Sequence, residues 1–197
     1  MISLEHRAAA LRKKIEAFAP LPDLEWKYLV GQLTARTLAA GEFFVREGES
    51  GTQVGFIESG LVKDCYLSED GKEYVKEFEG EGCFVGPYSA LLTDRVARFS
   101  TVALEPTSLL VMPLNTMEDL YARHACWDRF GRRLAEYLFL ERERRERELL
   151  IEDASERLAS FLECYGALAE RIPQKEIAAY LGITPVSLSR LRAQRRN

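Results

Sequence analysis

The sequence predicts an α+β fold in which a β-roll of the jelly-roll type precedes a long helix and a short helical hairpin. Between Thr34 and Pro113, short apolar runs alternate with glycines and acidic turns, a pattern typical of antiparallel strands. After Asn115 glycines become rare, and apolar residues recur at helical spacing. Strands that precede helices along one chain favour segregated β and α layers.

The first 33 residues precede the strands and are predicted to be helical. Leu11, Ile15 and Phe18 share one face of a helix, and the pair Pro20 and Pro22 interrupts it before a second apolar segment. Within the strand region, glycines are expected at the corners of the roll: Gly41, Gly48, Gly51, Gly60, Gly71, Gly80 and Gly82.

A long helix is predicted over residues 125 to 150. Its first half carries an apolar stripe, which is formed by Trp127, Phe130, Leu134, Tyr137 and Leu138. We interpret this stripe as a dimer interface, with packing onto the chain's own β-domain as the alternative. The following run Glu141 to Glu148 alternates charge at i,i+4 spacing, which favours a solvated helix surface.

The segment from Gln174 to Leu191 has the pattern of a helix-turn-helix. Ile177 and Leu181 share the inner face of the first helix, and Gly182 suits the left-handed turn that ends it. Thr184 is expected to cap the second helix. An ordinary helical hairpin packed in a core is the alternative.

Charge favours the helix-turn-helix. From Arg171 onward, six basic residues stand against the single acid Glu176, which gives this tail +5. Because the whole chain carries −4, the remainder carries −9. DNA would therefore be attracted to the tail and repelled by the rest of the chain.

Several classes of protein are not expected. No apolar run approaches the roughly 20 residues that span a membrane, and the start of the chain lacks a signal-peptide pattern, so a cytoplasmic protein is predicted. The two histidines, His6 and His124, are far apart, and the four cysteines form no CxxC pair. No metal site, cofactor or catalytic group is predicted, and hence no enzyme.

An amino-terminal β-roll, a long helix and a carboxyl-terminal helix-turn-helix together resemble the Crp/Fnr family of bacterial transcription regulators. The resemblance rests on GEFFVREGESGTQVGFIESGLVK, on GCFVG, and on RIPQKEIAAYLGITPVSLSRLR, which is similar to short-tailed, Bacteroidetes-type members that lack a carboxyl-terminal wing. It implies a cyclic-nucleotide-binding-like β-roll sensor over residues 1–120, a dimerisation helix over 121–152 and a DNA-binding domain over 153–197.

The resemblance also implies an effector pocket, for which the candidate residues are Gly86, Pro87, Tyr88, Ser89, Arg98 and Phe99. We call residues 86–89 and 98–99 the cassette. Relatives that bind cyclic nucleotides carry a glutamate where Pro87 stands and a small hydroxyl residue where Phe99 stands. Proline offers neither a carboxylate nor an amide N–H, so we do not expect cAMP binding. Arg98 alone can still hold another anion.

The expected function is that of a homodimeric regulator that binds double-stranded DNA. Arg190 is placed to read a guanine, Val186 can contact a thymine methyl, and the other positions contact bases or phosphates. The candidate DNA-binding residues are Gln174, Lys175, Thr184, Pro185, Ser187, Ser189, Arg190, Arg192, Arg195 and Arg196. RNA polymerase and an unidentified small-molecule effector are further expected partners. The alternative is a regulatory module that binds an effector or a protein without sequence-specific DNA binding, favoured by Val186 and the missing wing.

Overall fold

The computed structural model describes residues 4–93 and 96–195. Contacts between residues divide the chain into two compact units. The first comprises Met1–Asp64 and Phe78–Tyr137, and the second comprises Cys65–Glu77 and Leu138–Asn197.

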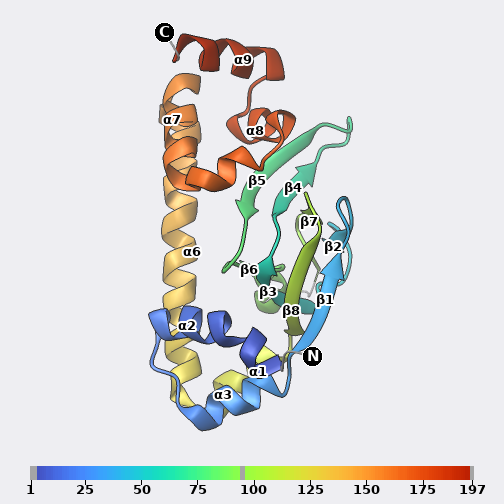
Figure 1. Ribbon diagram of the computed structural model, residues 1–197, viewed down its shortest axis with the longest axis vertical. Coiled ribbons are helices and arrows are strands. Elements are labelled where there is room, and N and C mark those ends of the chain that lie inside the picture. Colours follow the sequence, from blue (N-terminus) through green and yellow to red (C-terminus); the bar gives the residue numbers. More distant parts are fainter. Residues whose placement is uncertain (1–3, 94–95, 196–197) are drawn as a thin grey trace. The chain divides into compact units, whose positions relative to one another are not determined.

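Two four-stranded sheets form the β-roll, as predicted (Figure 1). One has the strand order β1-β8-β3-β6 and the other β2-β7-β4-β5. The strands are β1 (Thr34–Leu38), β2 (Phe43–Val45), β3 (Gln53–Ser59), β4 (Val62–Leu67), β5 (Glu73–Glu79), β6 (Phe84–Val85), β7 (Ser100–Ala103) and β8 (Thr107–Pro113). The predicted limits of the strand region, Thr34 and Pro113, are confirmed.

Apolar side chains from both sheets fill the space between them. Ile57 and Leu109, which are fully buried, come from one sheet, and Val62 and Ala103 come from the other. Antiparallel pairing sets the register, with Phe56 of β3 opposite Leu110 of β8. Because side chains alternate across a strand, this register directs one set of apolar residues into the core.

Two of the predicted corner glycines show why no other residue fits. Gly60 has φ +112°, and a Cβ there would lie 2.6 Å from the Thr107 Cα. Gly51 has no unusual φ, but a Cβ there would lie 2.5 Å from Pro87 Cγ. The first glycine is needed for the turn, and the second for the close approach of the cassette.

Helices before and after the strands complete the first unit. They are α1 (Leu4–Arg7), α2 (Ala9–Phe18) and α3 (Asp23–Val30) at the amino end, α4 (Tyr88–Leu92) within the roll, α5 (Thr116–Arg123), and the beginning of α6 (Ala125–Ile151). The predicted long helix thus begins at the expected residue and ends one residue later. Among the described residues, no helix is both long and apolar enough to cross a membrane.

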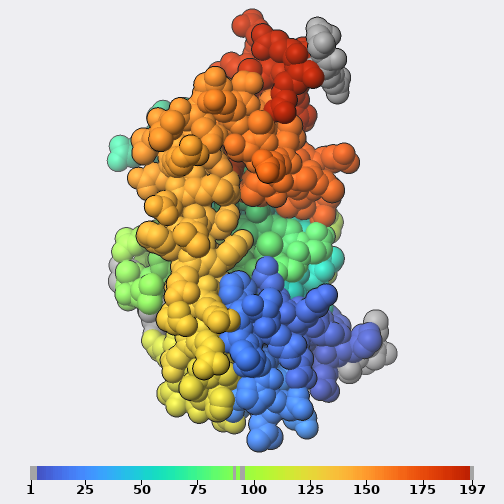
Figure 2. Space-filling view, turned by 90° about the vertical axis from the view of Figure 1, so that its left-hand side faces the viewer, coloured from blue at the N-terminus to red at the C-terminus, as the bar shows by residue number. Residues whose placement is uncertain are grey.

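The first three residues of the apolar stripe of α6 pack inside their own chain, and the dimer interface stays a prediction. Trp127, Phe130 and Leu134 are buried, and the Phe130 ring lies 5.8 Å from the rings of both Phe18 in α2 and Phe84 in β6. Figure 2 shows α2 against this part of α6. The alternative of packing within the chain holds for these three residues. An apolar stripe shows which face of a helix is buried but not which element covers it. Here the amino-terminal helix α2 covers part of this face through Phe18.

The two remaining members of the stripe differ from the first three. Tyr137 is exposed and Leu138 is partly buried. A second contact fixes the beginning of α6: the buried carboxylate of Glu25 accepts hydrogen bonds from Trp127 Nε1 at 3.0 Å and Arg123 Nε at 2.9 Å. This arrangement satisfies the indole N–H in an apolar setting.

The second unit contains the rest of α6 and the carboxyl-terminal helices. These are α7 (Ala154–Tyr165), the 3-10 helix η1 (Gly166–Glu170), α8 (Gln174–Leu181) and α9 (Pro185–Gln194). Asp153 caps α7 by accepting hydrogen bonds from the N–H groups of Ser155 and Glu156, and the Glu156 side chain accepts one from the Asp153 N–H. This capping box separates α7 from α6.

Candidate nucleic-acid interface

The turn between α8 and α9 has the predicted geometry. Gly182 is left-handed, with φ 70° and ψ 28°. The Ile183 N–H donates to the Ala178 carbonyl at 3.0 Å, and the Gly182 N–H donates to the Ala179 carbonyl at 3.3 Å. These bonds satisfy carbonyls that the end of a helix otherwise leaves unpaired.

The start of α9 is also as predicted. Thr184 Oγ1 accepts a hydrogen bond from the Ser187 N–H at 3.1 Å, and Pro185 occupies the first helical position. Ile177, Leu181 and Leu188 are buried and hold the two helices together. Local sequence signals therefore suffice to place both helices and the turn.

Most of the candidate DNA-binding side chains are exposed. The exposed ones are Gln174, Lys175, Thr184, Pro185, Ser189, Arg190 and Arg195. Ser187 and Arg192 are partly buried, and Arg196 lies outside the described residues. The Ser187 hydroxyl lies 2.9 Å from Thr184 Oγ1, so these two hydroxyls serve first as each other's partners.

Positive charge on this surface is largely uncompensated. Lys175 Nζ lies 3.4 Å from Glu176 Oε1, but within residues 4–93 and 96–195 no ion pair engages Arg190, Arg192 or Arg195. Val186, which is 62% exposed, places an apolar side chain among them. Exposed guanidinium groups beside an apolar contact can bind phosphates and the edges of bases.

Two arginines that were not among the predicted functional residues donate hydrogen bonds to carbonyls at the end of α8. Arg145 Nη2 donates to the Tyr180 carbonyl, and its guanidinium carbon lies 3.6 Å from the centre of the Tyr180 ring. Arg157 Nε donates to the Leu181 carbonyl at 3.1 Å. Burial raises the pKa of the Tyr180 phenol, which therefore stays neutral. We call Arg145 and Arg157 the arginine clasp.

The clasp corrects part of the interpretation of residues 141–148 as a solvated surface: four of these residues are exposed, but Arg145 is partly buried and Glu148 is buried. Glu148 is only 3% exposed and pairs with Arg145, with a 3.1 Å N–O distance, and also with Arg144. Among the described residues, the i,i+4 ion pair that this run forms is Arg144 with Glu148. The spacing of charged residues along α6 cannot predict that one of them donates a hydrogen bond to a backbone carbonyl of α8.

The cassette is packed rather than open. Pro87 is buried beside Gly51, and Phe99 is 5% exposed, whereas the neighbouring Arg98 is exposed. Gly86 has φ +123°, and Tyr88 and Ser89 begin α4, both partly buried. Phe99 and Pro87 therefore pack in the core, and the effector pocket stays a prediction.

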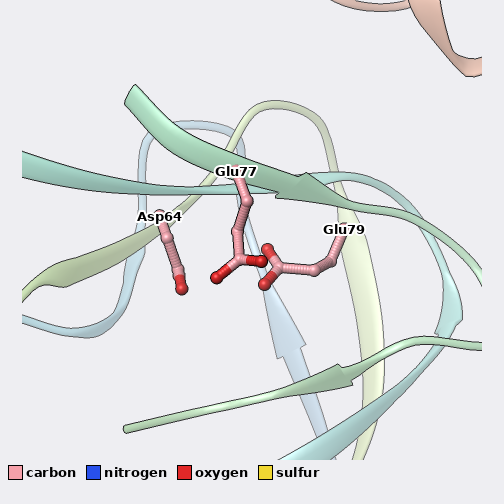
Figure 3. Close-up of side chains that lie close together, drawn as sticks. All are labelled: Asp64, Glu77 and Glu79. Atoms are coloured by element: carbon pink, nitrogen blue, oxygen red, sulfur yellow. The ribbon is translucent and has the colours of Figure 1, made fainter. Parts of the chain in front are cut away.

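A group of carboxylates that sequence reasoning missed lies on the β4–β5 hairpin. Side-chain oxygens of Asp64, Glu77 and Glu79 lie within 4.8 Å of one another (Figure 3). Asp64 is buried and accepts a hydrogen bond from Thr101 Oγ1 at 2.5 Å. The i,i+2 spacing of Glu77 and Glu79 was the available signal, since it puts both on one side of a strand. Three carboxylates alone do not define a metal site.

Comparison with known proteins agrees with this architecture. Residues 35–124 match the family model of the cyclic nucleotide-binding domain. FixK2 from Bradyrhizobium japonicum superposes with a TM-score of 0.73 at 23% identity, over 82% of this chain and 83% of that one. CLP from Xanthomonas campestris, a c-di-GMP-responsive global regulator, gives 0.71 at 16% identity, over 89% of this chain and 92% of that one. No curated protein matches the chain in sequence.

A third structure connects the fold to a named family. A candidate transcriptional regulator of the Crp/Fnr family from Eubacterium rectale gives a TM-score of 0.69 at 16% identity, over 89% of this chain and 84% of that one. Residues 35–124 are therefore similar in sequence to the cyclic nucleotide-binding domain. Across most of its length the chain has the fold of the Crp/Fnr regulators.

Proposed function

We propose that the protein is a homodimeric transcription regulator that binds double-stranded DNA through α8 and α9, which act as a helix-turn-helix. The observation that carries the proposal is the capped α8–α9 pair, whose buried residues hold it together while Arg190, Arg192 and Arg195 stay unpaired within the described chain. In this role α9 lies in the major groove, and the residues of its amino-terminal half contact the base edges.

Each exposed side chain then has a distinct task. Arg190 donates two hydrogen bonds to a guanine, and Val186 packs against a thymine methyl. Gln174, Lys175 and Arg195 bind phosphates, which fixes position without reading sequence. The β-roll acts as the sensor of an effector other than cAMP, since Pro87 and Phe99 serve packing instead of a nucleotide.

Dimerisation is assigned to a face of α6 other than the buried stripe. Phe139 and Leu140 are exposed, and Leu150 and Ile151 lie about three turns further along, on the same side of the helix. Phe139 is 64% and Leu150 75% exposed in the single chain. Figure 2 looks onto the side where α6 lies. Two copies that pair along this face cover apolar surface that one chain leaves in water.

A pair of adjacent leucines tests this face. Leu150→Glu is expected to give monomers in sedimentation, because it puts a charge into the proposed seam. Leu149→Glu is the matched control, since Leu149 is also exposed but points to a different side of α6. Dimers that persist in Leu150→Glu, or are lost equally in both variants, contradict the assignment.

DNA binding is tested by selecting bound fragments from random duplexes with the full chain. A two-fold dimer predicts half-sites about 10 base pairs apart, with pseudo-palindromic symmetry. For the selected duplex, log affinity should fall with log salt at a slope near −0.9 for each phosphate contacted. A flat salt response, or no enriched sequence, favours instead a module that binds an effector or a protein.

A further inference from the structure

A hollow of about 500 Å³ opens within the carboxyl-terminal unit, among α7, η1, the start of α8 and the end of α9. It is lined by Leu158, Leu162, Gly166, Ala169, Glu170, Gln174, Arg192 and Arg195. Its volume falls in the range of pockets that hold small organic molecules. No part of it belongs to the β-roll, where the fold leads one to expect an effector.

The floor of this hollow is apolar. Leu158 and Ala169 are buried, and Leu162, which is 37% exposed, also lines the hollow. Gly166 adds no side chain, and a Cβ there would meet nothing within 4 Å. Leu158, Leu162 and Ala169 thus give the lining an apolar part on which an unbranched chain can lie, and the lining has no aromatic side chain on which a base could stack.

The rim of the hollow is cationic. Arg192 is partly buried, and in the part of the chain that the structure describes no carboxylate or carbonyl accepts from its guanidinium. Arg195 is exposed and likewise unpaired there, and the single acid on the rim is Glu170. By contrast, Arg145 and Arg157 of the clasp both have carbonyl partners. A partly buried guanidinium without an acceptor is suited to an external anion.

We propose that this hollow binds a soluble anionic amphiphile, a molecule with one carboxylate or phosphate head and an unbranched apolar chain. The head accepts hydrogen bonds from Arg192 and Arg195, and the chain lies on Leu162 and Ala169. A phosphate of DNA would use the same arginines but would leave the apolar floor uncovered. The combination of a charged rim and an apolar floor therefore favours the amphiphile.

Binding has a consequence for DNA, and this consequence alone rests on the proposed function. Arg192 and Arg195 lie in and just after α9, so a ligand that occupies them competes with phosphates. The hollow then couples a small molecule directly to the DNA-binding surface. The ligand weakens the affinity for DNA by the same factor by which DNA weakens the affinity for the ligand, because their coupling is reciprocal.

The test titrates the full chain with monomeric dodecanoate, below its micelle concentration, by calorimetry. We expect one saturable site per chain for dodecanoate and none for acetate or dodecyltrimethylammonium. Arg192→Ala should weaken dodecanoate about tenfold, because it removes a hydrogen bond to a charged group. Leu162→Asp should abolish binding by placing a negative charge on the floor.

Matched controls keep the outcome unambiguous. Arg142→Ala and Leu24→Asp, at exposed positions outside the hollow, should bind dodecanoate as the parent does. Equal binding of acetate, equal binding of the cationic amphiphile, or binding only to vesicles of anionic phospholipid overturns the proposal. So does unchanged dodecanoate affinity in an Arg192→Ala protein with an unchanged melting curve.

A final measurement separates this inference from the proposed function. Dodecanoate is added to the complex of the full chain with its selected duplex, and we expect the duplex to be released. Dodecanoate binding without any duplex binding leaves the hollow in place and contradicts the DNA-binding role. Duplex binding that saturating dodecanoate does not change contradicts the coupling.

Discussion

The cassette and the α8–α9 pair are the two regions where the sequence predicts a ligand, and they are built in opposite ways. In the cassette, Pro87 lies against Gly51, and Phe99 is buried. On α9, Arg190 and Val186 project into solvent, and the buried residues lie on the other face. Side chains in the first region contribute to stability, and those in the second remain available for a partner. Substitutions in the two regions should therefore affect different measurements.

The largest effect is expected in the cassette. Phe99→Ala should lower the free energy of unfolding by about 3–5 kcal/mol, since it leaves a cavity where a buried ring was. Urea denaturation measures this loss. Arg98→Ala is the neighbouring control and should change stability by no more than about 0.5 kcal/mol, because Arg98 is exposed. Equal losses of stability in the two variants would contradict the conclusion that the buried Phe99 ring stabilises the cassette.

The arginine clasp should give the next largest effect. Arg145→Ala removes a charged donor from the Tyr180 carbonyl and one partner of buried Glu148, and we expect a loss of about 1.5–3 kcal/mol. Arg142→Ala, on the same helix but exposed, should leave the urea midpoint unchanged. An Arg145→Ala midpoint equal to that of the parent would mean that the clasp contributes no stability.

The residues that were predicted well are those whose signals are local. Gly182 and Thr184 each act through hydrogen bonds within a few residues, so the turn between α8 and α9 follows from the sequence. The strand limits and the span of α6 follow from periodicity and glycine spacing for the same reason.

The features that were missed depend on contacts distant in sequence. Phe130 is buried by Phe18, more than 100 residues away, and its apolar spacing would be the same against a second chain. Arg145 reaches the Tyr180 carbonyl in another helix, and a backbone carbonyl leaves no mark in the residue pattern. Likewise, the hollow at Arg192 exists only once α7 and α9 are packed.

On α9 the effect should fall on DNA rather than on stability. Arg190→Ala is expected to cost about 1–3 kcal/mol of discrimination at one base pair of the selected duplex, with an unchanged urea midpoint. Arg195→Ala should instead weaken all sequences alike and lower the salt slope by about one phosphate. Equal losses on selected and random DNA in Arg190→Ala would reassign Arg190 from base reading to phosphate contact.

The smallest effect is expected at Thr184, which both stabilises α9 and belongs to the candidate DNA-binding surface. Its hydroxyl caps α9, so Thr184→Ala should destabilise the chain by about 1 kcal/mol. Because the same substitution frays the first turn of α9, affinity for the selected duplex should fall as well. Thr184→Ser keeps the accepting oxygen and should restore both the urea midpoint and the affinity. If serine restored stability alone, the threonine methyl itself would be a contact with DNA, and Thr184 would belong with Val186 among the side chains that read sequence.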